Sequence, residues 1–145
     1  MRELPRQLSA DELAELFEGH TRFVERLAEI ENPLAAAPEL IATVPDDELV
    51  EALAAHPQIG ATQLSERSAR EQGEHADPTI ETELAYLNQV YEEKFGFRFV
   101  VFVNRRPKTE ILEVLRQRLE RTREEELDTA VEQLVAIAED RWRRS

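Results

Sequence analysis

The stretch DDELVEALAAHP, residues 46–57, carries the clearest helical pattern in the chain. Its first turn holds three carboxylates, which the positive end of the helix dipole favours. Leu49, Leu53 and His56 follow at i, i+4 and i+7 and therefore lie on one face. Proline at 57 disfavours the helical conformation of the residue before it. The sequence thus predicts a helix that ends at about His56, with the imidazole on its apolar face.

The rest of the chain has the same helical character. It has four glycines in 145 residues, and its apolar residues recur mostly at spacings of three and four. We expect an all-α fold: a single domain over residues 1–145, built as a bundle of about six to eight helices with one short extended segment near residues 98–103. Besides the helix at 46–56, helices are expected after a capping box at Ser9 and Glu12, at 21–30, within 65–73, and at 79–94, 108–119 and 124–143.

Prolines and one β-like run interrupt this pattern. Pro33, Pro38 and Pro45 are interpreted as punctuation between short helices, and Pro78 as the opening residue of the long helix. The run FRFVVFV, residues 97–103, is rich in branched and aromatic residues but has no second strand to pair with. It is therefore expected to be a buried extended segment or a helix start.

Composition narrows the function classes. The 31 acidic residues outnumber the 18 basic ones, so the net charge of -13 argues against nucleic acid and anionic membranes as partners. An anionic substrate would need local donors such as backbone N–H groups, Gln or Arg. The chain has no cysteine, and neither an apolar leader nor eighteen consecutive apolar residues occur. A soluble, cytoplasmic protein is expected.

His56 is the first candidate for chemistry. A helix carboxyl end favours the charged imidazolium, whereas burial favours the neutral ring. These opposing effects predict a pKa close to working pH, which suits a general acid or base. The structural alternative is a half-buried histidine that binds a carbonyl at the helix end.

The second candidate is SAREQ, residues 68–72, in which Ser68, Glu71 and Gln72 stand at i, i+3 and i+4. A hydroxyl, a carboxylate and an amide on one helical face are suited to binding a small polar molecule; the alternative is a solvated face. His56, Glu71, His75 and Asp77 lack the spacing of metal ligands, so no metal site is expected.

Two basic clusters, NRRPK at 104–108 and RWRRS at 141–145, are interpreted as structural. Arginines in a last helical turn offset the helix dipole. Arg105 or Arg106, which follow the apolar run, have the reach to enter a pocket.

Taken together, HPQIG (56–60), SAREQ (68–72) and LNQVYEEKFGFRFVVFV (87–103) resemble the 2-oxo-4-hydroxy-4-carboxy-5-ureidoimidazoline (OHCU) decarboxylases of urate degradation. The segment FEGHTRFVERLA (17–28) is similar to the amino-terminal part of that family. The resemblance covers roughly residues 9–143. The chain departs from the common family pattern at Gln58 and Ile59, where Asp-Leu is usual, and at Arg98, where proline is usual.

The resemblance implies a small all-helical carboxy-lyase, often a homodimer, that needs no metal or organic cofactor. Its reaction converts OHCU to (S)-allantoin and carbon dioxide. His56 then corresponds to the catalytic acid/base, which orients the substrate hydroxyl and transfers a proton. Glu71 assists by setting the histidine tautomer or by holding the ureido group. The implied substrate contacts are Pro57, Ser68, Gln72, and the apolar segment Phe99, Val100, Val101, Phe102 and Val103, which lines the pocket largely through its backbone.

Two other functions fit the same sequence. One is a non-catalytic helical binding module that keeps the fold. The other is a lyase that acts on a related ureido or imidazoline acid.

Overall fold

The computed structural model describes residues 3–56 and 78–144, and these residues form seven helices and no strand. The predicted all-α class is therefore confirmed for this part of the chain. The helix predicted within 65–73 lies outside the described residues. The helices are α1 (Ala10–Phe17), α2 (Arg22–Ala28), α3 (Pro33–Ile41), α4 (Asp46–Ala54), α6 (Pro78–Phe95), α7 (Lys108–Arg118) and α8 (Arg123–Arg144).

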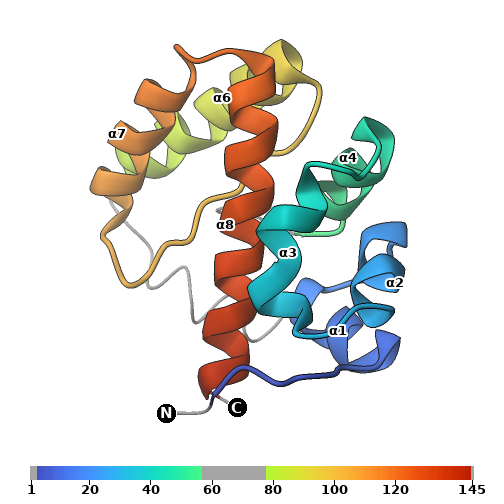
Figure 1. The fold of residues 1–145 in the computed structure, drawn as a ribbon. Coiled ribbons are helices and arrows are strands. Elements are labelled where there is room, and N and C mark those ends of the chain that lie inside the picture. Colours follow the sequence, from blue (N-terminus) through green and yellow to red (C-terminus); the bar gives the residue numbers. More distant parts are fainter. Residues whose placement is uncertain (1–2, 57–77, 145) are drawn as a thin grey trace.

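The long helix α8 is the centre of the arrangement (Figure 1). Helices α1, α3 and α4 pack against it on one side, and α2 packs against α1 and α4. Helices α6 and α7 pair with each other on the opposite side of α8 (Figure 1). The face of α8 that meets these elements is apolar, because Leu127, Val131, Leu134 and Ala138 recur along it and are buried. None of the helices in the described ranges has the length and apolar content needed to span a bilayer.

Helix starts agree with the sequence signals. The Ser9 hydroxyl accepts the Glu12 N–H at 3.1 Å, and the Glu12 carboxylate accepts the Ser9 N–H at 3.0 Å, which confirms the predicted capping box. The Thr21 hydroxyl caps α2 by accepting the Val24 N–H at 3.2 Å. The predicted bounds of α6, α7 and α8 are each within one residue of the observed ones.

The prediction for Pro38 is wrong, because this proline lies inside α3 instead of between two helices. Pro33 does open the helix, as expected for a residue without an N–H. Pro38 lies on the exposed side of the helix, and the N–H that it lacks would have paired with the Leu34 carbonyl one turn earlier. Burial of Leu34 and Ile41 on the opposite side keeps the helix continuous across it.

Residues 98–103 form the predicted extended segment between α6 and α7. Phe99 packs edge to face against Tyr91 of α6, with ring centroids 5.2 Å apart. The Arg118 guanidinium of α7 donates to the Val100 carbonyl at 2.7 Å. The same guanidinium donates to the fully buried Glu126 carboxylate of α8 at 2.7 Å. The segment is thus tied to the core at both its side chains and its backbone.

The two ends of the described chain meet. The Trp142 indole N–H, near the end of α8, donates to the Glu3 carbonyl at 2.7 Å. Figure 1 shows both termini at the same end of α8.

Candidate functional site

His56 lies just beyond the carboxyl end of α4, as the sequence predicts. Its N–H donates to the Leu53 carbonyl at 3.2 Å, and the helix itself ends at Ala54. The residue is 7% exposed, so the imidazole is on the buried face. Helix periodicity and the proline at 57 therefore located this side chain correctly.

A carboxylate and a guanidinium surround the ring. The Glu18 carboxylate lies 3.8 Å from His56 Nδ1, and the Arg141 guanidinium lies 3.9 Å from the same carboxylate oxygen. Arg141 also donates to the Leu16 carbonyl at 2.8 Å, and its side chain is 1% exposed. Among the described residues, none forms a hydrogen bond with His56 Nδ1. The three elements α1, α4 and α8 thus bring a carboxylate, an imidazole and a guanidinium together.

The backbone conformation at the end of α1 places Glu18 beside His56. Glu18 caps α1 in the left-handed conformation, with φ 61° and ψ 32°, which is uncommon for a residue with a Cβ. The next residue, Gly19, approaches α4 so closely that a Cβ there would lie 3.0 Å from the Ala55 Cβ. A side chain at position 19 would therefore crowd Ala55 where α1 turns away, and the close approach places Glu18 near the residue that precedes His56.

The pKa expected for His56 is wrong. Burial lowers it from 6.5 to about 4, and the positive charge of Arg141 adds to that shift. The Glu18 carboxylate raises the pKa but does not offset burial, and Arg98 lowers it further. His56 is consequently neutral at pH 7 in the free protein, with one nitrogen as donor and the other as acceptor.

Sequence reasoning missed Arg141, which was assigned to dipole compensation at the end of the last helix. Its guanidinium instead binds the last turn of α1 through the Leu16 carbonyl. The signal was present, because Leu134, Ala138 and Arg141 stand at i, i+4 and i+7 on the buried face of α8. The same spacing that located His56 would have located this arginine.

The backbone of the 99–103 segment is heavily engaged. The Phe102 N–H donates to the Gln133 side-chain carbonyl at 2.8 Å. Arg106 donates to the Phe102 and Val103 carbonyls at 2.6 and 3.1 Å. Arg106 thus binds carbonyls three and four residues earlier in the chain. Sequence reasoning considered instead that it reaches into a pocket.

Several predicted site residues lie outside the described ranges: Pro57, Ser68, Glu71 and Gln72, together with His75 and Asp77, which were weighed as metal ligands. Across residues 3–56 and 78–144, no group of three or more His, Cys, Asp or Glu side chains is suited to hold a metal ion. Of the predicted site residues, the structure therefore describes His56 and the 99–103 segment.

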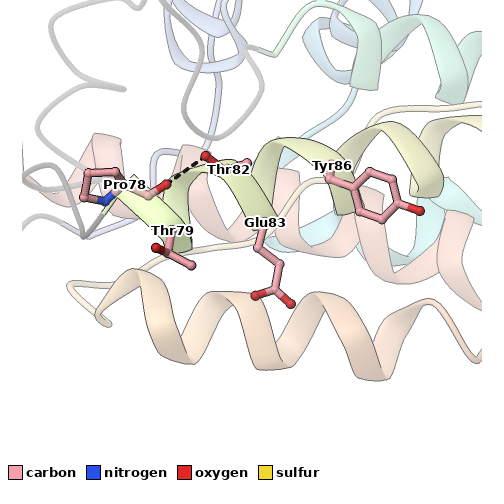
Figure 2. Close-up of a pocket in the computed structure, with 5 residues that line it drawn as sticks. All are labelled: Pro78, Thr79, Thr82, Glu83 and Tyr86. Carbon is pink, nitrogen blue, oxygen red and sulfur yellow. Dashed lines mark hydrogen bonds between the residues drawn. The ribbon is translucent and has the colours of Figure 1, made fainter.

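A groove on α6 contains none of the predicted residues. It is lined by Pro78, Thr79, Thr82, Glu83 and Tyr86 (Figure 2). The Thr82 hydroxyl donates to the Pro78 carbonyl at 2.8 Å, and the Glu83 carboxylate is paired with Arg116 of α7. The Thr82 hydroxyl and the Glu83 carboxylate are thus already engaged within the protein, which makes the surroundings of His56 the stronger candidate site.

Comparison with known proteins gives the family. The sequence model of the OHCU decarboxylase family matches residues 2–143. The chain belongs to the OHCU decarboxylase family. Among solved structures, an OHCU decarboxylase crystallised in the presence of (S)-allantoin has a TM-score of 0.74 and 26% identity, covering 90% of this chain and 94% of that one. An (S)-allantoin synthase structure has a TM-score of 0.67 and 25% identity, covering 91% of this chain and 47% of that one.

Two relatives of this OHCU decarboxylase family member are named for uric acid degradation or for OHCU decarboxylation. The uric acid degradation bifunctional protein of Bacillus sp. (strain TB-90) is 31% identical over 105 residues, which are 69% of this chain and 21% of that protein. The 2-oxo-4-hydroxy-4-carboxy-5-ureidoimidazoline decarboxylase of Halalkalicoccus jeotgali is 30% identical over 94 residues, which are 61% of this chain and 53% of that protein. The matches thus span about a fifth to about half of these relatives' own lengths.

Proposed function

We propose that the protein decarboxylates OHCU to (S)-allantoin and carbon dioxide, as a step of urate degradation. The observation that carries this proposal is the buried, neutral His56 at the end of α4, in a chain whose family model matches residues 2–143. The similarity to a structure of an OHCU decarboxylase crystallised in the presence of (S)-allantoin supports the same activity. The alternatives are a non-catalytic binding module of this fold and a lyase on a related ureido or imidazoline acid.

The reaction asks little of the protein beyond positioning and a proton. The bond between the ring carbon and the carboxylate breaks, and carbon dioxide leaves without the bonding electrons. The electron pair moves from the former carboxylate carbon toward the neighbouring ring carbon, which bears the ureido group, and spreads into the conjugated imidazolone as an enolate-like intermediate. The hydroxyl on the former carboxylate carbon loses its proton and becomes a ring carbonyl, and a proton delivered to one face of the ureido-bearing carbon completes (S)-allantoin. Hydrogen-bond donors that hold the ring and the carboxylate in place therefore accelerate the step.

His56 is proposed to orient the substrate hydroxyl and to transfer the proton. A neutral imidazole is able to accept a hydrogen bond from a hydroxyl through one of its two nitrogens. An anionic substrate placed beside the ring favours the imidazolium and raises the pKa of His56 from about 4. The substrate thus brings the histidine toward the range in which it exchanges a proton at neutral pH.

The buried Arg141 addresses the difficulty of binding an anion to a chain of net charge -13. Its guanidinium puts a positive charge close to His56, within a part of the molecule from which water is excluded. We include Arg141 among the residues that attract the substrate carboxylate. The Glu18 carboxylate lies 3.9 Å from the same guanidinium.

Glu71 is proposed to set the tautomer of His56 or to hold the ureido group. Pro57, Ser68, Gln72 and the 99–103 segment are proposed as substrate contacts. We further propose that residues 1–145 form one domain, that two copies associate as a homodimer, and that the protein acts in the cytoplasm.

The test is a stereospecific assay. OHCU is generated from urate enzymatically, and the circular dichroism of (S)-allantoin is followed with wild-type protein and with His56→Ala and Glu71→Gln. His20→Gln is the matched control, because the side chain of His20 is 61% exposed. We expect wild type and His20→Gln to exceed the spontaneous rate by the same factor and both site variants to lose most of it.

Two results would contradict these assignments. If His56→Ala and Glu71→Gln keep near-wild-type rates, the site is elsewhere. If wild-type protein gives no acceleration, the binding module is favoured, and a panel of related ureido and imidazoline acids then tests for the other lyase.

A further inference from the structure

The carboxyl end of α4 lacks a local source of positive charge. The last turns of helices leave carbonyl oxygens without intrahelical partners, and cations stabilise this end of the helix dipole. Helix α4 has no basic residue in its last turn. Residue 57 is a proline and has no N–H to donate. A positively charged donor from another part of the chain would therefore stabilise the backbone that carries His56.

Arg98 is that donor. Its Nη1 donates to the Ala54 carbonyl at 3.1 Å and to the His56 carbonyl at 2.5 Å. One guanidinium nitrogen thus joins the last residue of α4 to the residue proposed to carry the chemistry. Charge-assisted hydrogen bonds of this kind are roughly twice as strong as neutral ones.

The base of the Arg98 side chain is fixed by the core. Phe97 and Phe99, on either side, both pack edge to face against Tyr91, with centroids 5.9 and 5.2 Å away. Successive side chains of extended backbone point in opposite directions, so anchoring both neighbours directs Arg98 away from this cluster. The Glu92 carboxylate, 3.5 Å from Nε, holds the guanidinium from behind.

We propose that Arg98 is a positioning residue that fixes the backbone of His56 by binding the carbonyls of Ala54 and His56, and so aims the imidazole at the substrate. The inference rests on the proposed function of His56. It concerns how this chain holds the ring, because the contacts of Arg98 with α4 and its end, among the described residues, are with backbone oxygens.

The test compares Arg98→Met with Arg123→Met. Arg123 binds the opposite end of the same helix, through Asp46 at 2.9 and 3.0 Å, and also binds the Phe95 carbonyl at 3.0 Å. Both substitutions remove an arginine that holds α4, but only Arg98→Met releases the end that carries His56. Urea unfolding of each variant measures the loss of stability separately from the loss of activity.

The expected result is a selective loss of turnover. Arg98→Met should lower kcat about tenfold or more, with KM within about threefold of wild type, because misplacing a reacting group impairs the chemical step more than binding. Arg98→Lys keeps the charge on a compact ammonium group but lacks the planar fork of the guanidinium, so it should recover part of the loss. Arg123→Met should keep the wild-type kcat.

A second readout does not depend on the substrate. In protein labelled with 13C-histidine, the His56 ring resonance is assigned from its absence in His56→Gln and titrated with acid. Burial is the main cause of the low pKa of His56 and the Arg98 charge adds to it, so Arg98→Met should shift the titration midpoint upward. Arg123→Met should leave the midpoint unchanged.

The proposal is overturned if Arg98→Met leaves both kcat and the His56 resonance as in wild type, or if both arginine variants change them equally. If wild-type protein does not accelerate the reaction, the proposed function fails, and the resonance comparison alone decides whether Arg98 positions the ring.

Discussion

The burial of a neutral histidine predicts that the protein loses stability in mild acid. Folding lowers the pKa of His56 from 6.5 to about 4, chiefly through burial. In this interval the unfolded chain binds a proton that the folded protein does not, so acid favours unfolding. The stability that depends on a neutral His56 is fully present above pH 6.5 and is lost as the pH falls toward 4.

The magnitude follows from the two pKa values. A shift from 6.5 to about 4 corresponds to a maximum of about 3.4 kcal/mol, at 1.36 kcal/mol for each pH unit. Between pH 7 and pH 4.5, the linkage relation gives a loss of roughly 2.4 kcal/mol from this one ring. That is a large share of the 5–15 kcal/mol by which domains are typically stable.

Urea unfolding followed by circular dichroism at pH 7.0, 5.5 and 4.5 measures the effect, with wild type, His56→Gln and His20→Gln. Arginine partners lower the pKa values of Asp46 and Glu48, and burial raises that of Glu139. The Glu139 effect has the opposite sign, because its folded form binds the proton more tightly. All three groups are common to the variants and cancel in the difference between them.

The expected outcome is that His56→Gln removes roughly 2 kcal/mol of the pH dependence, whereas His20→Gln follows wild type. The comparison remains valid even if His56→Gln is less stable at every pH, because only the slope is used. The reasoning is refuted if the pH dependence of His56→Gln equals that of wild type within about 0.5 kcal/mol, the precision to which independent effects add.

Three further outcomes are expected. Glu126→Leu leaves Arg118 buried without its carboxylate and should reduce the free energy of urea unfolding by about 3–5 kcal/mol, whereas adding Arg118→Met should recover part of it. Ser9→Ala removes the α1 cap at a cost of about 1 kcal/mol, seen as a Tm lower by about 2–4 °C. Glu18→Gln removes the charge that raises the pKa of His56, so the NMR titration midpoint of the ring should fall; an unchanged midpoint would contradict the assigned contact.

What the sequence predicted well depends on neighbours along the chain. The Ser9 cap, the end of α4 and the burial of His56 follow from spacings of three or four residues and from one proline. The extended segment at 98–103 was likewise predicted from its composition and from the lack of a partner strand. Pro38 was mispredicted because its position on the exposed side of α3 is set by packing, which local signals do not report.

The features that could not be predicted from the sequence depend on contacts between residues that are distant along the chain. The sign of the His56 pKa shift is decided by burial and by Arg141, which comes from the far end of the chain. The left-handed turn at Glu18 has no local signal apart from Gly19 beside it. Arg98 was noted only as a departure from a family pattern, and its role at the end of α4 emerges from hydrogen bonds that span 42 and 44 residues.

The contact between Trp142 and Glu3 makes the described chain nearly a closed ring. Because the ends are already side by side, a short connecting peptide would cost little additional chain entropy. The helices could then follow one another along the chain in a different order and still occupy the same positions in space. A circularly permuted protein with new ends in a surface turn is therefore expected to retain the packing contacts around α8. The same closeness means that any domain attached at either end would leave the bundle at one place.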